Sequence, residues 1–323
     1  MKRRQFNQAL LAACCASAAP LGAQETYPNK PVRLLVPSTA GGGIDLLARM
    51  FAQRLSEQMG QQFVVDNVGG AGGTIASGTL ARANPDGYTL IFQATTAAVN
   101  AAALTKLRFD AVNDVTPVSA AARFPLVMVV NPNVPAKDLR EFIALLRANP
   151  GKYSYGSAGV GTGTHLAAEW FKLLAKVSIL HIPYKGTGAV MPDLLSGQVH
   201  MLFDGLPPQS GNIKAGRVRP LAVTTQKRAP NLADVPAMSE VLTGYDLPFW
   251  TGVFAPPKTP KPIVDRLAAE MRKAASSPEL TARLQEFGAE PMPMTPTEFS
   301  DYWTQQVALY KKIIKDANIK LED

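Results

Sequence analysis

The chain has 323 residues, of which 46% are hydrophobic and 18% are charged, with 25 Gly and 26 Pro. This length is ample for a large buried core, and chains beyond about 250–300 residues usually form more than one. The balanced composition excludes a disordered or collagen-like chain. The net charge of +8 is modest and spread along the sequence, so we expect no nucleic-acid partner.

The first 23 residues have the pattern of an export signal. Residues 1–4 are positively charged, and residues 9–23 form an apolar stretch that ends in small side chains. We expect cleavage after Ala23, or nearby after Ala18. The apolar run is too short to cross a bilayer, which needs about 20 residues. The sequence therefore predicts a signal peptide at 1–23 and a periplasmic product.

The signal segment leaves the route of export open. Its Lys-Arg-Arg-Gln-Phe sequence resembles a twin-arginine signal, although paired arginines also occur in general secretory signals. Residues 11–14 resemble a lipoprotein cleavage site, but the apolar run before them is short. Cys14 and Cys15 are the only cysteines, so the mature chain is expected to fold without disulfides.

Strands and helices are predicted to alternate along the mature chain, which favours an α/β fold with helices on both faces of parallel or mixed sheets. Apolar runs predict strands at 32–36, 63–65, 88–93, 126–130, 153–155, 179–182, 199–203, 221–223 and 251–255. Amphipathic spacing predicts helices at 44–59, 138–149 and 164–175. Thr259-Pro260 and Thr295-Pro296 are each expected to open a further helix, with Thr as the N-cap and Pro as the first helical residue.

The alternation restarts after residue 130, and the chain is predicted to return to its first half near residue 249. We therefore expect two lobes: residues 24–130 and 249–323 form the first, and residues 131–248 form the second. The chain would cross between them near 131–134 and near 245–249. Two thin crossings allow closure about a hinge.

Three junctions between a strand and a helix are rich in glycine, at residues 37–43, 156–164 and 183–188. In an open α/β sheet such turns line the crevice beyond the carboxyl ends of the strands. Their free N–H groups and the helix dipole favour an anion. Each junction alone could be an ordinary turn, whereas three together favour a ligand crevice.

The class of anion follows from which motifs are missing. No Gly-Lys-Ser/Thr sequence of a phosphate loop occurs, and Gly159-Val160-Gly161 lacks the third glycine of a dinucleotide site. A carboxylate is the remaining common small anion.

Four side chains near these junctions are candidate ligand contacts. Asp45 lies in the first turn of its helix, where it could contact a ligand or only stabilise the dipole. Asp204 follows a strand and could be only a turn residue, or could accept a hydrogen bond from a ligand hydroxyl, an ammonium or an ordered water. His165 could enter the cleft, or only cap or pack, and Thr95 follows the third predicted strand.

Signatures of an enzyme are sparse. The three histidines, at 165, 181 and 200, form no His-Glu-x-x-His motif, and no Gly-x-Ser-x-Gly motif occurs. A dispersed Ser/His/Asp set stays open, but nothing in the sequence favours one. We expect neither catalysis, nor a metal, nor a cofactor.

An ordered set of motifs runs from about residue 26 to the C-terminus. The motifs are Tyr27-Pro28-x-Lys30-Pro31-Val32-Arg33-Leu34, Gly41-Gly42-Gly43-x-Asp45, Val64-Val65-Asp66-Asn67, Gly70-Ala71-Gly72-Gly73, Pro85-Asp86-Gly87-Tyr88-Thr89-Leu90, His181-Ile182-Pro183-Tyr184-Lys185-Gly186 and Thr295-Pro296-x-Glu298-Phe299. Taken together and in this order, they resemble one known family, the Bug-type (TctC-like) extracytoplasmic solute receptors of tripartite tricarboxylate transporters.

This resemblance implies a two-lobed periplasmic binding protein of type II, the Venus-flytrap fold, with crossover strands. It implies a small organic acid as ligand: a di- or tricarboxylate, an acidic amino acid or an aromatic acid. It also implies membrane permease subunits as partners, and we expect a monomer. A ligand-presenting partner of a sensor kinase, or an exported α/β hydrolase, is an alternative function.

The resemblance also implies where the ligand is held. The first loop would contribute Thr39, Ala40, Gly41, Gly42, Gly43 and Asp45, and the second Ser157, Gly159, Gly161 and Thr162, with Asp204 beyond its strand. Two departures concern ligand choice: Ala40 stands where the family usually has Pro, and Val68-Gly69 replaces Arg-Pro.

Overall fold

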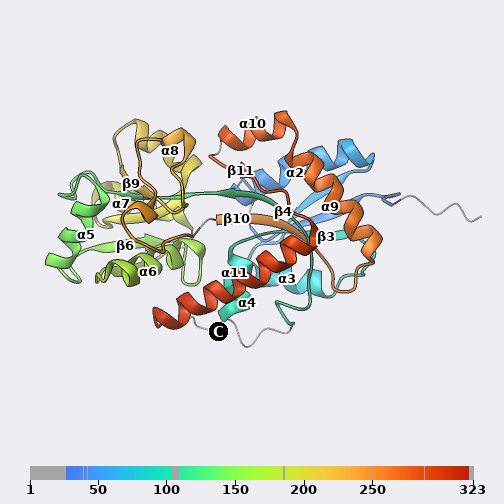
Figure 1. The fold of residues 1–323 in the computed structure, drawn as a ribbon, viewed down its shortest axis with the longest axis horizontal. Helices are drawn as coiled ribbons and strands as arrows, with labels where there is room; N and C mark the ends of the chain where they lie inside the picture. Colours follow the sequence, from blue (N-terminus) through green and yellow to red (C-terminus); the bar gives the residue numbers. More distant parts are fainter. Residues whose placement is uncertain are drawn as a thin grey trace, which may run out of the picture.

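The computed structural model describes residues 27–38, 40–41, 43–103, 109–184, 186–247, 249–286 and 288–319. The expected signal peptide, Thr39 and Gly42 lie outside these residues. The described chain forms two α/β lobes, each built on one sheet, which lie side by side in Figure 1.

The first sheet has six strands in the order β11-β4-β10-β3-β1-β2. Its strands are β1 (Val32–Val36), β2 (Phe63–Asn67), β3 (Thr89–Ala94), β4 (Thr116–Phe124), β10 (Phe249–Ala255) and β11 (Glu290–Pro291). The first three are parallel, whereas β10 runs antiparallel to β3 and β4. Covering helices are α2 (Gly43–Met59), α3 (Thr74–Ala81), α4 (Thr96–Ala103), α9 (Lys261–Ala275), α10 (Pro278–Glu286) and α11 (Pro296–Asp316), with a 3-10 turn η1 (Ala71–Gly73).

The second sheet has five strands in the order β7-β6-β8-β5-β9. They are β5 (Leu126–Val130), β6 (Ser154–Ser157), β7 (Leu180–Pro183), β8 (Met201–Gly205) and β9 (Arg219–Val223). Strand β6 is parallel to β7 and β8, and β5 is antiparallel to β8 and β9. Its helices are α5 (Leu139–Ala148), α6 (Gly163–Ala175), α7 (Thr187–Ser196) and α8 (Leu206–Lys214), with 3-10 turns η2 (Pro230–Leu232) and η3 (Met238–Glu240).

The first crossing between the sheets lies earlier than expected. Strand β4 belongs to the first sheet and β5 to the second, so the chain crosses at Pro125 rather than near 131–134. The expected lobe boundary after residue 130 is therefore wrong for residues 126–130. The Ser119–Ala122 stretch of small residues in β4 carries no clear strand signal, so the sequence pattern does not predict this strand and groups β5 with the first lobe.

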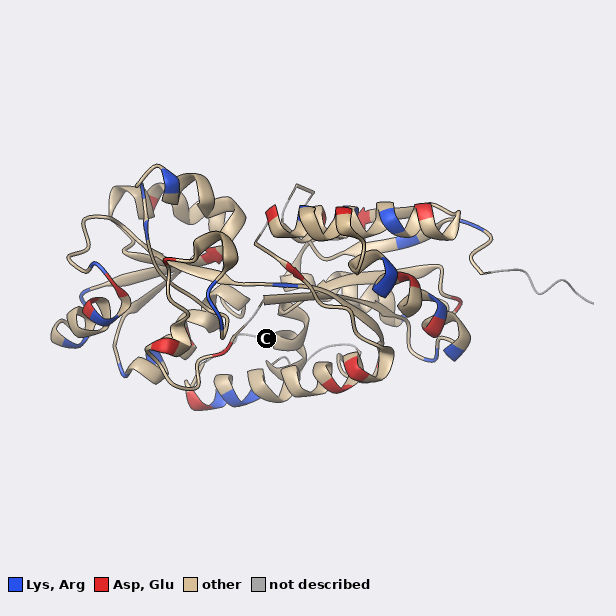
Figure 2. Ribbon diagram, turned by 45° about the horizontal axis from the view of Figure 1, so that its top comes forward, with Lys and Arg blue, Asp and Glu red and all other residues tan. Residues whose placement is uncertain are grey.

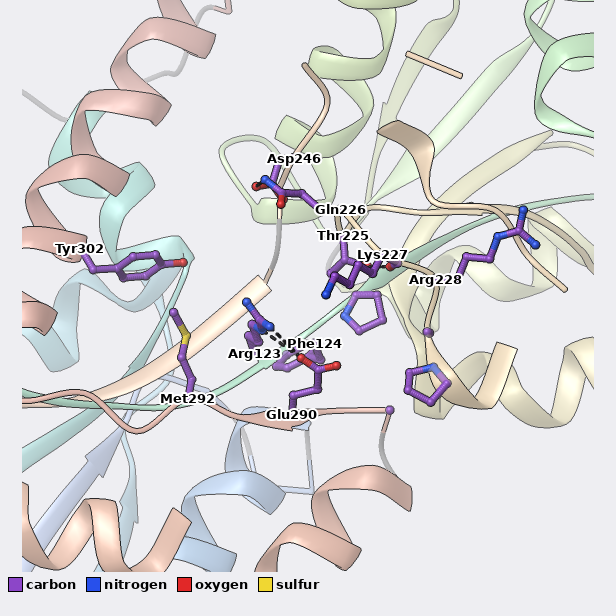
Figure 3. A pocket seen from close by; sticks show the side chains of 14 residues that line it. Arg123, Phe124, Thr225, Gln226, Lys227, Arg228, Asp246, Glu290, Met292 and Tyr302 are labelled. Atoms are coloured by element: carbon purple, nitrogen blue, oxygen red, sulfur yellow. Dashed lines mark hydrogen bonds and ion pairs between the residues drawn. The ribbon is translucent and has the colours of Figure 1, made fainter. Parts of the chain in front are cut away.

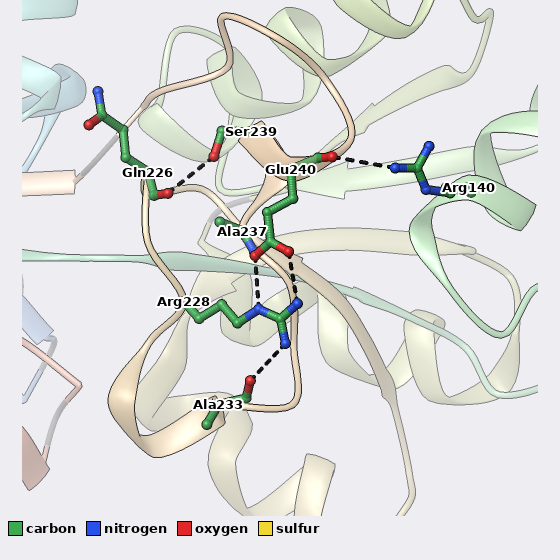
Figure 4. A network of polar contacts seen from close by, with 7 residues as sticks. All are labelled: Arg140, Gln226, Arg228, Ala233, Ala237, Ser239 and Glu240. Atoms are coloured by element: carbon green, nitrogen blue, oxygen red, sulfur yellow. Dashed lines mark hydrogen bonds and ion pairs between the residues drawn. The ribbon is translucent and has the colours of Figure 1, made fainter.

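The return crossing occupies the segment between β9 and β10. There Leu247 N–H donates to the Thr224 carbonyl at 3.0 Å, and Thr224 N–H donates to the Leu126 carbonyl at 2.9 Å, so the two crossings are hydrogen-bonded side by side. Further along this segment, Arg228 binds both carboxylate oxygens of Glu240 at 2.8 Å, and the Ala233 carbonyl at 3.1 Å (Figure 4). The segment is thus folded back on itself.

Helix α11 makes a third link between the lobes that the sequence did not predict. It packs against α4 of the first lobe and α6 of the second, and Lys312 Nζ lies 5.6 Å from the centre of the Trp170 ring of α6. Basic and acidic residues are interspersed along the helices of both lobes (Figure 2).

The two Thr-Pro helix starts have different outcomes. Thr295 caps α11 as predicted: its hydroxyl accepts from Glu298 N–H, and Glu298 reaches back to Thr295 N–H at 2.8 Å. The prediction for Thr259 is wrong, since α9 begins at Lys261 with Pro260 as its N-cap. The Thr259 hydroxyl donates instead to the Pro256 carbonyl at 2.8 Å, so it closes the preceding turn.

Candidate ligand-binding cleft

A cavity of about 560 Å³ lies between the lobes, on the side where several helices begin. Its wall includes the first residues of four helices: Gly43 of α2, Thr96 of α4, Gly163 of α6 and Thr187 of α7. A fifth helix, α8, brings its N-cap residue Gly205. The first N–H groups of a helix have no partner within it, and its dipole is positive there. These helix starts make the cavity favourable for an anion.

The rest of the wall is largely apolar. Leu46 and Ile44 come from α2, Leu126 from β5, and Pro207 and Pro208 from α8. Two further residues, Phe124 and Phe249, lie where the crossings meet the first sheet, with ring centres 4.8 Å apart. Among the described residues that line the cavity there is no Lys or Arg. An anion bound there would be held by dipoles and hydroxyls, with apolar surface around its body.

The first-lobe loop is held by Asp45. Its carboxylate accepts from Gly41 N–H at 2.8 Å, from Arg49 Nε at 3.0 Å and from Asn67 Nδ2 at 2.9 Å. Burial alone would raise the pKa of Asp45, but the hydrogen bonds from Arg49, Gly41 and Asn67 outweigh it and lower the pKa below its usual range. The Asp45 side chain is therefore engaged in shaping the loop.

The second-lobe loop, residues 157–162, satisfies most of its own amides. Ala158 N–H donates to the Thr164 hydroxyl at 3.0 Å, and Gly159 N–H donates to the Ser157 hydroxyl at 3.1 Å. Gly161 N–H donates to His165 Nδ1 at 3.2 Å. The backbone φ values of +128° at Gly159 and +76° at Gly161 are in the region that favours glycine. The loop is a folded unit that leads directly into α6.

Behind this loop lies a stack of three rings. The His181 ring is 4.8 Å from Tyr155 and 4.1 Å from His165, with interplanar angles of 17° and 16°. The hydroxyl of Tyr155 donates to Glu169 at 2.5 Å, and Lys172 pairs with the same Glu169 oxygen at 2.6 Å. Burial is the main cause that lowers the pKa of His165 to about 4, and it also lowers that of His181. Both histidines are therefore neutral at pH 7.

Asp204 is a buried carboxyl on the cavity wall, at the end of β8. It accepts from Gly205 N–H at 2.8 Å and from Gln209 Nε2 at 2.7 Å. Burial raises its pKa, and hydrogen bonds from Gln209, Thr187 and Gly205 only partly oppose this. A carboxyl in this state suits a ligand hydroxyl or a water better than a second anion.

The structure brings together some of the residues named from the sequence and separates others. Gly41, Gly43, Thr162 and Asp204 line the cavity. Ala40, Asp45, Ser157, Gly159, Gly161 and His165 belong to the two loops or lie behind them, without lining it. Thr95 is buried beside β10, where its hydroxyl accepts from Trp250 N–H at 2.9 Å. Ligand contact by any of these residues stays a prediction.

Several lining residues were not among the ligand contacts named from the sequence, including Thr96, Phe124, Leu126, Thr164, Thr187 and Phe249. Thr96, Thr164 and Thr187 lie within the first two residues of their helices, so accurate helix boundaries would have found them. Phe124 and Phe249 flank the crossings and depend on strand pairing across the sheet, for which the local sequence gives no signal.

A second cavity, of about 260 Å³, lies beside the two crossings between the lobes and shares Phe124 with the first (Figure 3). Its charged groups are mostly paired within the wall: Arg123 donates to Glu290 at 2.9 Å, and Gln226 donates to Asp246 at 2.7 Å. The Tyr302 hydroxyl is buried there without a hydrogen-bond partner among the described residues. With its polar pairs and smaller volume, it is the less suitable of the two for a small organic anion.

Two further features of the described part of the chain bear on function. None of its helices has both the length and the apolar character required to cross a bilayer. Within the same residues, no three side chains of His, Cys, Asp or Glu converge where they could hold a metal ion.

The family model described as "Tripartite tricarboxylate transporter family receptor" matches residues 47–319. The chain belongs to this family. The resemblance to Bug-type receptors is confirmed by Protein BugT of Bordetella pertussis, which is 32% identical over 310 residues that cover 94% of each protein.

Solved structures of relatives confirm the fold of this receptor. R. palustris Rpa4515 with adipate is 37% identical, with a TM-score of 0.83 over 91% of this chain and 99% of that one. MatC (Rpa3494) from Rhodopseudomonas palustris with bound malate is 29% identical, with a TM-score of 0.78 over 89% and 100% of the two chains. The expected two-lobed α/β binding-protein fold is therefore correct.

Proposed function

We propose that this receptor captures a small organic carboxylate in the cleft cavity and presents it to the membrane permease of a tripartite transporter. The observation that carries the proposal is the set of four helices that begin at one cavity whose described lining has no Lys or Arg. Helix starts bind carboxylates without a fixed counter-charge. The similarity to structures with bound adipate and malate supports the same ligand class.

Binding is coupled to closure of the lobes in this proposal. The cavity wall draws on both lobes, with Gly43 and Thr96 from one and Thr162 and Thr187 from the other. A ligand that contacts both sides favours the closed form by its differential affinity, and about 5.5 kcal/mol would shift a 1:99 population to 99:1. Closure would also change the outer surface, which lets a permease distinguish loaded from empty receptor.

The proposed setting is the periplasm. Residues 1–23 would direct export and be cleaved, and the mature receptor would act as a monomer that meets the permease subunits at the membrane. Mass analysis of the exported protein and its mass in solution test these two points.

A thermal-shift screen of organic acids tests the proposed function. Each acid is paired with its amide or alcohol as an uncharged control of the same size. Ligand at one hundred times its dissociation constant should raise the free energy of unfolding by about 2.7 kcal/mol. Mass spectrometry of small molecules released from natively purified receptor identifies the natural acid. Equal stabilisation by the uncharged analogues would reject a carboxylate receptor.

A further inference from the structure

The stacked histidines lie behind the second-lobe loop, and each makes a hydrogen bond to it. His165, 5% exposed on α6, accepts Gly161 N–H through Nδ1 at 3.2 Å. His181 of β7 places Nε2 2.7 Å from the Ser157 hydroxyl, which in turn accepts Gly159 N–H at 3.1 Å. The two rings therefore hold the loop at both ends.

The direction of the Gly161 bond fixes the chemical state of His165. A backbone N–H can only donate, so Nδ1 must be the unprotonated nitrogen of a neutral ring. A protonated ring has no acceptor, and it would leave the Gly161 N–H without this partner. The hydrogen bond thus exists only while His165 is uncharged.

Burial is the main reason that both rings are neutral, because it lowers the pKa of His165 and of His181. On α6 itself, the charge of Glu169 raises the pKa of both rings, although Glu169 is also engaged by Tyr155 and Lys172. Lys172 opposes Glu169 and lowers both pKa values.

Charged groups on the neighbouring elements are engaged elsewhere. Asp193 of α7 accepts from the Tyr184 hydroxyl, Asp204 of β8 is bound to Gln209, and Lys312 of α11 lies over the Trp170 ring. None of these contacts joins a charge to either imidazole. His165 is therefore placed to act as a neutral acceptor, and the neutral His181 ring to share a hydrogen bond with the Ser157 hydroxyl in either direction.

We propose that His165 and His181 are positioning residues for the ligand, which act through their neutral rings by holding the loop at Gly161 and Ser157. Neither ring lines the cavity, whereas Thr162 and Gly163, which immediately follow Gly161, do. A loop released at Gly161 would shift these two lining residues. This inference rests on the proposed function, because it concerns the affinity for the captured acid.

Two substitutions at each histidine distinguish the loss of the hydrogen-bonding nitrogen from the loss of the ring itself. In His165→Asn the side-chain oxygen replaces Nδ1 and cannot be protonated, and in His165→Leu no acceptor remains. His181→Gln and His181→Leu form the corresponding pair for Nε2. The chain also offers a matched control, His200→Leu, because His200 Nδ1 accepts the N–H of Ser154 at 3.1 Å at the opposite end of β6.

Calorimetric titration at pH 7 with adipate, and with malate as a second probe, measures the effect. We expect the two Leu variants to bind the acid about tenfold more weakly or worse, since a partly buried donor or hydroxyl loses its partner. His165→Asn and His181→Gln should remain within about threefold of the unsubstituted receptor, and so should the His200→Leu control. Thermal unfolding confirms that each variant is folded.

A second measurement needs no ligand. In an amide-resolved NMR titration, the Gly161 N–H signal should move with the same midpoint as the His165 ring, and it should be insensitive to pH in His165→Asn. The proposal is overturned if the Gly161 signal does not follow the ring. It is also overturned if Leu and Asn at position 165 weaken binding equally. If no acid in the screen binds the unsubstituted receptor, the proposed function itself fails, and the NMR titration still decides whether His165 holds the loop.

Discussion

The two loops that face each other across the cleft are held by opposite means. The first-lobe loop depends on the charged carboxylate of Asp45, which gathers Gly41 N–H, Arg49 and Asn67. The second depends on two neutral imidazoles that accept from Gly161 and interact with Ser157. Asp45 is buried while its partner Arg49 is 50% exposed, whereas His165 is enclosed by other rings. The hydrogen bonds to the charged Asp45 carboxylate should therefore persist in mild acid. The hydrogen bond to the neutral ring of His165 should weaken as that ring becomes protonated.

The largest expected effect of this difference is on stability at low pH. The folded pKa of His165 is about 4, below its usual value of 6.5, so between these values the unfolded chain binds a proton that the folded chain does not. Stability from this group is fully present above pH 6.5 and is lost as pH falls towards 4. The loss is about 3 kcal/mol if the shift is realised in full. Asp45 loses its contribution only below pH 3.8, because its folded pKa is lowered from that value.

Urea unfolding at pH 7.5, 5.5 and 4.5 measures this loss, and the difference between the receptor and His165→Asn isolates it. That subtraction is needed because His181 contributes with the same sign. Asp204 contributes with the opposite sign, since its raised folded pKa adds stability that is lost as pH rises. Parallel stability curves for the two proteins would show that His165 is not held neutral by the fold.

The contrast between the anchors could be predicted only in part from the sequence. Glycine-rich turns between strands and helices placed both loops at the cleft, because apolar strands and amphipathic helices leave a clear periodic signal. Each loop is held partly by residues far away in sequence: Asn67 binds Asp45, and His181 binds Ser157. The sequence suggested that His165 caps, packs or enters the cleft, and its hydrogen bond to Gly161 emerged only from the folded loop.

The same limit applies to the fold. Strand β1 was predictable because its residues are apolar and buried in the first sheet. Strand β4 was not, since Ser119–Ala122 acquires strand structure from its neighbours β10 and β11. That single omission moved the predicted crossing from Pro125 to residues 131–134. Phe124, which both cavities share, was missed for the same reason.

The second expected effect sharpens the comparison at the charged anchor. Asp45→Ala removes the acceptor of one backbone N–H and of two side chains, and should lower the free energy of unfolding by about 2 kcal/mol at pH 7. Asp66→Ala is the matched control, because Asp66 also pairs with an arginine, Arg33, but both side chains are substantially exposed. Such exposed pairs contribute about 0–1 kcal/mol. Equal losses in the two variants would mean that Asp45 is no more than a surface ion pair.

The smallest expected effect comes from replacing one glycine in each loop, because only one of the two has a backbone conformation that favours glycine. Gly159 has a φ of +128°, and a Cβ there would lie 3.3 Å from the Tyr184 carbonyl oxygen. Gly43 has no positive φ, and a Cβ there would meet nothing within 4 Å, although the residue lines the cavity. Gly159→Ala should therefore destabilise the receptor by about 1 kcal/mol. Gly43→Ala should change its stability by less than about 0.5 kcal/mol while weakening adipate binding.

A third glycine provides a control for the effect of a Gly→Ala change within a helix. Gly211 of α8 also has open space for a Cβ and does not line the cavity, so Gly211→Ala should leave adipate affinity unchanged. Calorimetry on the three variants measures whether the added Cβ occupies ligand space, and urea unfolding measures whether it strains the backbone. If Gly43→Ala binds adipate as well as Gly211→Ala does, the start of α2 does not contact the ligand. If Gly159→Ala is as stable as Gly43→Ala, the second loop does not need its left-handed residue. The second loop would then depend on its histidine anchors rather than on a fixed backbone.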